Sequence, residues 1–392
     1  MNSKKKIAKG FAKIIIFIII FSMIFVGGSY LLLPKVKDDA TGKPVNMITS
    51  CKVLDKNTVD VIILGDSDAY RGVNPMKIWM DQGITTCLIG HSFCTEPELY
   101  YRAVDILKHQ QPKYMILETD CMFEDSNKFA ELDEEALIDA EELIPDGNNE
   151  IDTESTDPFG IGKIEDKLSN FETGILASID SRYPLMKFNY RWKQVEFDEI
   201  FQTSLDRAFT SRGYLTSNEH LAFEFGDEYM TNGCEPDSVH EIDDLTLEYF
   251  NKIVELCKDN DIELALLTVP TGYGWNWSKH NAITQLAEEN GLSYIDYNAQ
   301  INEVEDFDWY KDSKDGGIHL NKTGSSKVTN AYEKVLVDEY GLKPSVLTDE
   351  VRQKWNDDTA IFYEKNFKFP KEKTYAILDR HYNEYVASGL LK

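Results

Sequence analysis

The sequence predicts a three-layer α/β protein in which helices cover both faces of a mainly parallel sheet. Short apolar runs typical of buried strands alternate with longer helix-like runs over residues 57–119, and the alternation resumes over residues 244–340. Such alternation favours parallel strands joined by helical crossovers. Ligands of these sheets bind outside the carboxyl ends of the strands, so a functional site is expected in the loops that follow them.

The individual elements follow from the same pattern. The apolar run 59–64 is expected to form the first strand, because Val, Ile and Leu dominate it. The first block then continues with a helix at 76–82, a strand at 85–89, a helix at 96–111 and a strand at 114–119. The second block supplies a helix at 244–258, a strand at 262–269, a helix at 282–290, a strand at 292–297 and a closing helix at 322–340. Together the blocks predict one domain over residues 57–342.

A long insertion, at about 120–241, interrupts the alternation. Residues 131–157 are strongly acidic and are expected to form a surface loop with a short helix. Residues 183–192 are rich in aromatic side chains, which suits either a helix on the flank of the domain or a segment that lines the active-site mouth or docks on a membrane partner. The C-terminal tail, 343–392, is expected to form two short helices.

The N-terminal region predicts a membrane anchor. Residues 14–33 contain no charged side chain, and about 20 apolar residues are enough for a helix to cross a bilayer. A cleaved signal peptide is less favoured, because its apolar core would be shorter and no small-residue cleavage site follows. Five lysines lie within residues 1–13, so the N-terminus is expected in the cytoplasm. Residues 34–56 would then link the anchor to an extracytoplasmic domain of a single-pass cell-membrane protein.

Composition excludes some classes of function. The net charge is −27, from 68 acidic and 41 basic residues, so binding to the phosphates of nucleic acid is not expected. The six cysteines show no C-x-x-C spacing, and neither a metal nor another cofactor is expected. A disulfide is permitted outside the membrane, although the spacing selects no pair. Cys87 and Cys257 lie in apolar runs and are interpreted as ordinary buried thiols.

Two short motifs could supply a nucleophile and its base. Ser67 follows the first predicted strand directly, at a position where α/β enzymes hold nucleophiles. His319 lies in the late glycine-rich segment Asp315 to Asn321, just before the closing helix. A serine hydroxyl needs a base such as imidazole to remove its proton, and a carboxylate to orient that base. His91 and His280 are rival bases, because each follows a predicted strand.

These motifs resemble the SGNH, or GDSL, hydrolase superfamily over roughly residues 57–340. The resemblance is carried by Gly65-Asp66-Ser67 near the start and by the late loop with Asp315 and His319. More narrowly, residues 64–70, Asn74-Pro75, Pro112 to Tyr114, His319 to Asn321 and Gly324 resemble a membrane-anchored branch. Members of that branch work beside membrane-bound O-acyltransferases and are related to the D-alanine transfer protein of the teichoic acid pathway. The resemblance implies an SGNH-like, flavodoxin-like sheet.

The resemblance also implies roles for individual residues. Ser67 would be the nucleophile and His319 the base. Family members commonly carry the acid three residues before the histidine, where this chain has Gly316, so Asp315 at four residues is favoured over Asp312 at seven.

Oxyanion donors are less well matched to the family. The backbone at Ser67 and Gly90 would supply two of them, and Asn321 is a further candidate for oxyanion or substrate binding. Where the superfamily often has an asparagine, this chain has Glu118-Thr119-Asp120. Asp68 is also unusual beside a nucleophile, and would either cap the following turn or pair with Arg71.

The expected function is that of an extracytoplasmic serine O-acyltransferase. With a membrane-bound O-acyltransferase protein as partner, it would move an acyl group, most simply acetyl, onto a cell-envelope or secreted polysaccharide. An esterase with the same triad is one alternative, because only access of water to the acyl-enzyme separates the two reactions. A noncatalytic scaffold for the membrane acyltransferase is the other.

Overall fold

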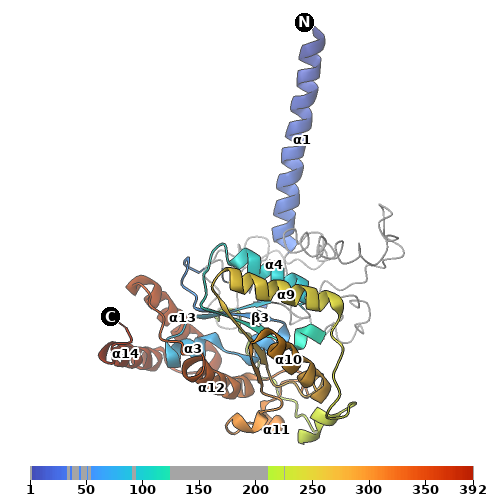
Figure 1. Cartoon of the computed structure of the whole chain (residues 1–392). Coiled ribbons are helices and arrows are strands. Elements are labelled where there is room, and N and C mark those ends of the chain that lie inside the picture. The colour runs from blue at the N-terminus through green and yellow to red at the C-terminus, as the bar shows by residue number, and fades with distance from the viewer. Residues whose placement is uncertain are drawn as a thin grey trace.

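The computed structural model describes residues 2–32, 36–37, 44–45, 51, 54–90, 94–123, 211–224 and 226–391. A five-stranded parallel sheet forms the centre of the domain (Figure 1). In spatial order its strands are β4 (Thr86–Gly90), β3 (Val61–Gly65), β5 (Tyr114–Glu118), β6 (Glu263–Thr268) and β7 (Ser293–Asp296). In chain order this is 2-1-3-4-5, the flavodoxin-like arrangement. The predicted parallel α/β sheet is confirmed.

Strand β3, which lies between β4 and β5, is buried on both faces. Every residue from Val61 to Gly65 is buried, as expected for a strand that neighbouring strands flank and helices cover on both sides. Its register pairs Gly65 with Gly90 on β4, and Leu64 with Leu117 on β5. The carboxyl ends of β3, β4 and β5 therefore meet at one edge, as the sequence predicts.

Helices form the two outer layers. Figure 1 shows α4 (Glu96–Ile106) and α9 (Asp244–Asp259) side by side on one face of the sheet, with α3 (Pro75–Gln82) and α12 (Lys322–Asp338) on the other. The described residues also form α2 (Ser67–Gly72), α10 (Trp277–Asn290) and α11 (Trp309–Asp312), and, in the C-terminal tail, α13 (Asp349–Phe367) and α14 (Lys371–Ala387). Short 3₁₀ turns occur at Asp120–Phe123, Gly226–Thr231 and Ile301–Glu303.

Three helix predictions differ from the structure. Helix α4 ends at Ile106 and not at residue 111, because the amides of Lys108 and His109 bond three residues back, to the carbonyls of Asp105 and Ile106, and not four. Helix α10 begins at Trp277 and not at 282, because the Asn276 side chain caps its first turn. The tail forms two helices as predicted, but they are 19 and 17 residues long and not short.

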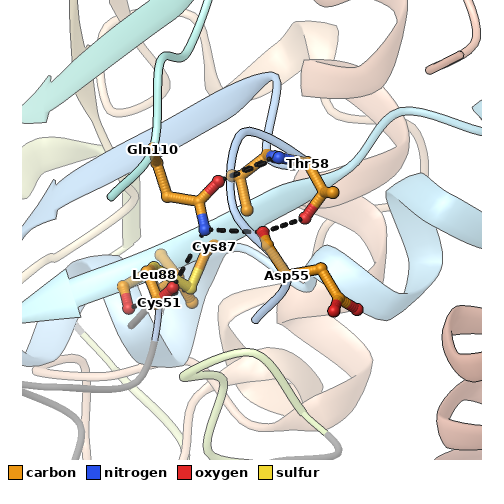
Figure 2. Close-up of a disulfide and its surroundings, with 7 residues drawn as sticks. Cys51, Asp55, Thr58, Cys87, Leu88 and Gln110 are labelled. Atoms are coloured by element: carbon orange, nitrogen blue, oxygen red, sulfur yellow. Dashed lines mark hydrogen bonds between the residues drawn. A yellow bond between two sulfur atoms is a disulfide. The ribbon is translucent and has the colours of Figure 1, made fainter. Parts of the chain in front are cut away.

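A disulfide joins Cys51 to Cys87 on β4 (Figure 2). The interpretation of Cys87 as a free buried thiol is therefore wrong, whereas Cys257 is free and buried as predicted. The buried Gln110 side chain supports the same entry segment, because its Nε2 donates to the carbonyls of Cys51 and Asp55 while its Oε1 accepts from the amide of Thr58. Covalent and polar contacts thus fix the start of the domain to the sheet.

The N-terminal helix α1 covers Asn2–Leu32. Large apolar side chains along it are exposed, including Phe17 at 67% and Met23 at 70%. No helix among the described residues has the length and apolarity required of a membrane span. Residues 36–37 and 44–45 form the small antiparallel pair β1 (Val36–Lys37) and β2 (Pro44–Val45). The acidic segment 131–157 and the aromatic segment 183–192 lie outside the described residues.

Candidate active site

Ser67 is the first residue of α2, directly beyond the carboxyl end of β3. Asp66 is the N-cap of this helix, and its Oδ1 accepts the Asp68 amide at 3.0 Å. The apolar strand thus ends at a capped turn that holds the serine at the edge of the sheet. Ser67 is only 8% exposed.

The backbones of β3 and β4 approach closely beside Ser67. Gly90 has φ +159°, and a Cβ at this position would lie 1.6 Å from the Gly65 carbonyl oxygen. Only glycine fits there, because any side chain would push the two strands apart. The loop that follows, residues 91–93, lies outside the described residues, and so does the rival base His91. The role of Gly90 in oxyanion binding therefore stays a prediction.

His319 and Asp315 form a hydrogen-bonded pair. His319 Nδ1 lies 2.6 Å from Asp315 Oδ2, and the His319 amide donates to Asp315 Oδ1 at 2.7 Å. Burial alone would raise the pKa of Asp315, but hydrogen bonds from the His319 ring and amide, with the positive charge of Lys314, outweigh it and lower the pKa. An ionised Asp315 holds the proton on Nδ1, which leaves Nε2 as the acceptor. Among the described residues, Nε2 is buried and has no hydrogen-bond partner.

The loop carrying this pair is closed on itself. Ser313 and Leu320 form an antiparallel bridge, and the Lys314 amide donates to the His319 carbonyl at 2.9 Å. Gly317 has φ +106°, and a Cβ there would lie 2.4 Å from the Phe223 ring, so glycine is required. The extra residue between acid and base is accommodated by this glycine turn.

Asp312, the alternative acid, has other partners. Its buried carboxylate accepts Lys327 Nζ at 2.7 Å and the Asp308 amide at 2.7 Å. The geometry therefore favours Asp315 over Asp312 as the partner of His319.

Asn321 has a structural position that does not support the predicted role in substrate binding. It is the N-cap of α12, and its Oδ1 accepts the amides of Thr323 and Gly324. Its Nδ2 donates to the carbonyls of Lys311 and Ser313, at 2.7 and 3.1 Å. Both amide hydrogens are thus used within the loop, and neither is left for an oxyanion.

The fold brings the Ser67 turn and the His319 loop to the same edge of the sheet. Helix α2 packs against α12, which begins directly after the His319 loop. The Gly317 carbonyl in that loop accepts the amide of Gly272, beyond β6. Asp315 is near enough to Asp68 for its charge to contribute to raising the pKa of Asp68. Ser67 and His319 are not hydrogen-bonded to each other in the described residues.

Four carboxylates, those of Asp66, Asp68, Glu118 and Asp120, lie close together near Ser67. Burial raises the pKa of Asp68, and so do the charges of Asp66, Asp120 and Glu118. Burial likewise raises the pKa of Glu118, helped by Asp66 and Asp120, although its carboxylate accepts the amides of Asp120 and Val269. Sequence reasoning missed this cluster. The signal was present, since pairs of acids follow two strands that are neighbours in the sheet.

Both expectations for the Asp68 side chain are wrong. Asp66, and not Asp68, caps the turn. Arg71 donates to the carbonyls of Leu215 and Thr216 and forms no ion pair with Asp68 in the described residues. Asp68 is 4% exposed, and none of the described residues donates a hydrogen bond to its Oδ1.

His280, the other rival base, belongs to a second pair at the edge strand β7. Its Nδ1 lies 2.7 Å from Asp296 Oδ2, which also accepts Trp275 Nε1 at 2.8 Å. A groove of about 520 Å³ lies beside it. Strand β7 is three positions from β3, or about 14 Å at the usual spacing between strands. His280 is therefore too far away to remove a proton from Ser67.

Neither a protein-family model nor a curated protein matches this chain. Among solved structures, it is similar to a protein from Bacteroides fragilis NCTC 9343 described as a "putative acylhydrolase". The identity is 14%, the TM-score is 0.31, and the similarity covers 73% of this chain and 90% of that one. A likeness at this identity and TM-score carries no information about activity.

Proposed function

We propose that this chain is a serine-dependent acyl-transfer enzyme that uses Ser67, His319 and Asp315. One observation carries the proposal: a buried imidazole nitrogen without a partner is oriented by a carboxylate, in a loop next to the helix that packs against α2, where Ser67 lies. A structural histidine would normally form hydrogen bonds with both ring nitrogens when buried. A catalytic base keeps one nitrogen free to accept a proton from the serine or from a substrate.

The proposed chemistry has two steps. Ser67 Oγ attacks an acyl carbonyl as His319 Nε2 takes its proton, and the leaving group then accepts that proton as the acyl-serine forms. In the second step His319 removes a proton from an acceptor hydroxyl, which attacks the acyl-serine, and His319 returns that proton to Ser67 Oγ as the ester bond to the serine breaks. Asp315 keeps Nδ1 protonated throughout and stabilises the charged ring. Backbone amides at the start of α2 are the candidate oxyanion donors.

We further propose that the acyl acceptor is a polysaccharide hydroxyl and that a membrane-bound O-acyltransferase protein is the acyl donor. The burial of Ser67 and of His319 Nε2 supports transfer over hydrolysis, because a site that restricts water protects an acyl-serine. The proposal also has α1 attach the protein to a membrane, and the exposed apolar side chains of that helix support this. The disulfide supports an extracytoplasmic location. Protease added to intact cells should then cut most of the chain.

Labelling of the full-length protein with a fluorophosphonate tests the chemistry. Wild type should react at Ser67, while Ser67→Ala should not react and His319→Gln should react at least about 10³-fold more slowly. Ser217→Ala, which removes another serine hydroxyl from the same part of the domain, is the matched control and should label normally. A folded wild type that does not react would refute the proposal and favour a scaffold.

Polymer analysis separates transfer from hydrolysis. Cells carrying Ser67→Ala should lose O-acyl groups from their envelope or secreted polysaccharide while polymer length stays unchanged. A gain in acylation would instead identify the protein as an esterase.

A further inference from the structure

We propose that Asp66, Asp68 and Asp120 bind one divalent cation, of the type that prefers oxygen ligands, beside Ser67. Each residue offers a carboxylate oxygen, and the three oxygens lie within 4.8 Å of one another. Asp66 follows β3 and Asp120 follows β5, so the cluster lies between the two strands where the strand order reverses. Parallel sheets bind their ligands at this switch point.

The Asp68 side chain provides independent evidence for a missing positive partner. Its exposure is 4%, and its Oδ1 accepts no hydrogen bond from any described residue. Removing an ionised carboxylate from water without a partner is strongly unfavourable. Lys279 contacts the cluster at Asp120 Oδ1, 3.4 Å away, and in the described part of the chain no donor reaches Asp68 Oδ1.

The donor set selects the class of cation. Three carboxylate oxygens suit Ca²⁺, Mg²⁺ or Mn²⁺, whereas zinc and copper sites favour nitrogen and sulfur ligands. Oxygens on opposite sides of a Ca²⁺ ion are about 4.8 Å apart, and those on opposite sides of Mg²⁺ about 4.2 Å. The 4.8 Å limit on the oxygen separations in the cluster equals the span across Ca²⁺, whereas Mg²⁺ would require every pair of ligand oxygens to lie within about 4.2 Å. The spacing therefore suits Ca²⁺ best, with water completing the coordination.

A cation here would change the electrostatics of the nucleophile. Asp66 and Asp68 flank Ser67 in the chain, and their negative charge opposes an oxyanion formed at that residue. A bound divalent ion would offset that charge. This consequence rests on the proposed acyl transfer, whereas cation binding itself does not.

Cation titration of the full-length protein tests the site. After removal of metals with EDTA, Ca²⁺, Mg²⁺ and Mn²⁺ are titrated separately and followed by calorimetry and by the melting temperature. We expect about one ion bound per chain and a saturable rise in melting temperature for at least one of the three. Asp68→Asn should weaken binding by about tenfold or more, because it removes one charged ligand. The matched control Asp237→Asn alters an exposed carboxylate outside the cluster and should bind as wild type does.

Two outcomes would overturn the cation site. One is a wild type that binds none of the three ions. Another is an Asp68→Asn variant with wild-type affinity.

Fluorophosphonate labelling keeps the two proposals apart. Labelling of Ser67 without cation binding overturns only the cation site. Cation binding to a protein that never labels supports the site and refutes the acyl-transfer function.

Discussion

Glu333 should make the stability of the fold depend on pH. It lies on α12 and is only 6% exposed, and its Oε2 has no hydrogen-bond partner in the described residues. Burial raises its pKa from 4.5 to about 8, and Lys77, whose Nζ lies 4.0 Å from Oε1, is too distant to reverse the shift. The folded state therefore holds a proton between pH 4.5 and 8 that the unfolded state releases, so stability falls as the pH rises through this range.

The size of the effect follows from the shift. A change from 4.5 to about 8 corresponds to at most about 5 kcal/mol at 1.36 kcal/mol per pH unit. Glu333→Gln keeps the shape and cannot ionise. Its free energy of unfolding should match that of wild type below pH 4.5 and exceed it by up to this amount above pH 8. Urea unfolding at pH 5, 7 and 9 measures the difference, with Glu255→Gln as an exposed control. Parallel pH curves for wild type and Glu333→Gln would refute the reasoning.

Three further predictions concern the site and the sheet. Asp315→Asn should slow fluorophosphonate labelling about 10³-fold to 10⁴-fold at neutral pH, because Nδ1 loses its carboxylate. The stabilisation contributed by the ionised Asp315 should be present above pH 3.8 and lost as the pH falls through its lowered pKa, which unfolding curves of the variant would reveal by converging with wild type in acid. Replacing Cys51 and Cys87 together by serine should cost about 2–4 kcal/mol of stability, measured by urea unfolding, while Cys234→Ser should cost little. Gly90→Ala should give insoluble protein on expression, because its methyl group meets the Gly65 carbonyl.

The sequence predicts the sheet well because its strands are buried on both faces. Val61 to Leu64 form an uninterrupted apolar run, and such runs mark a buried strand whatever packs around them. Helix ends are predicted less well, because capping side chains, local backbone bonds and tertiary partners decide them. Gln110 fits a helix by pattern, yet its side chain is used by the entry segment from Cys51 to Thr58.

The site is predicted in part for a similar reason. Asp315 and His319 are close in sequence, and their pairing depends on a short glycine turn that sequence spacing constrains. The disulfide of Cys87 depends on Cys51, which lies 36 residues away in the sequence. The surroundings of Asp68 depend on Glu118 and Asp120, which the neighbouring strand β5 brings close to it. Apolar neighbours in the sequence indicate burial of a cysteine or a carboxylate, but they do not identify the group that meets it in the folded chain.

The hydrogen bonds of the Asn321 side chain have a consequence for how the site could adapt to a substrate. Its side chain holds the start of α12 and the carbonyls on the other side of the loop at once, so acid and base are locked to that helix as a single moving part. Any displacement of this loop relative to α2 then alters the gap between the unit and the serine, and leaves the geometry within the unit unchanged. Under the proposed acyl transfer, such a displacement would decide when the hydroxyl loses its proton, while the ring that receives it stays oriented.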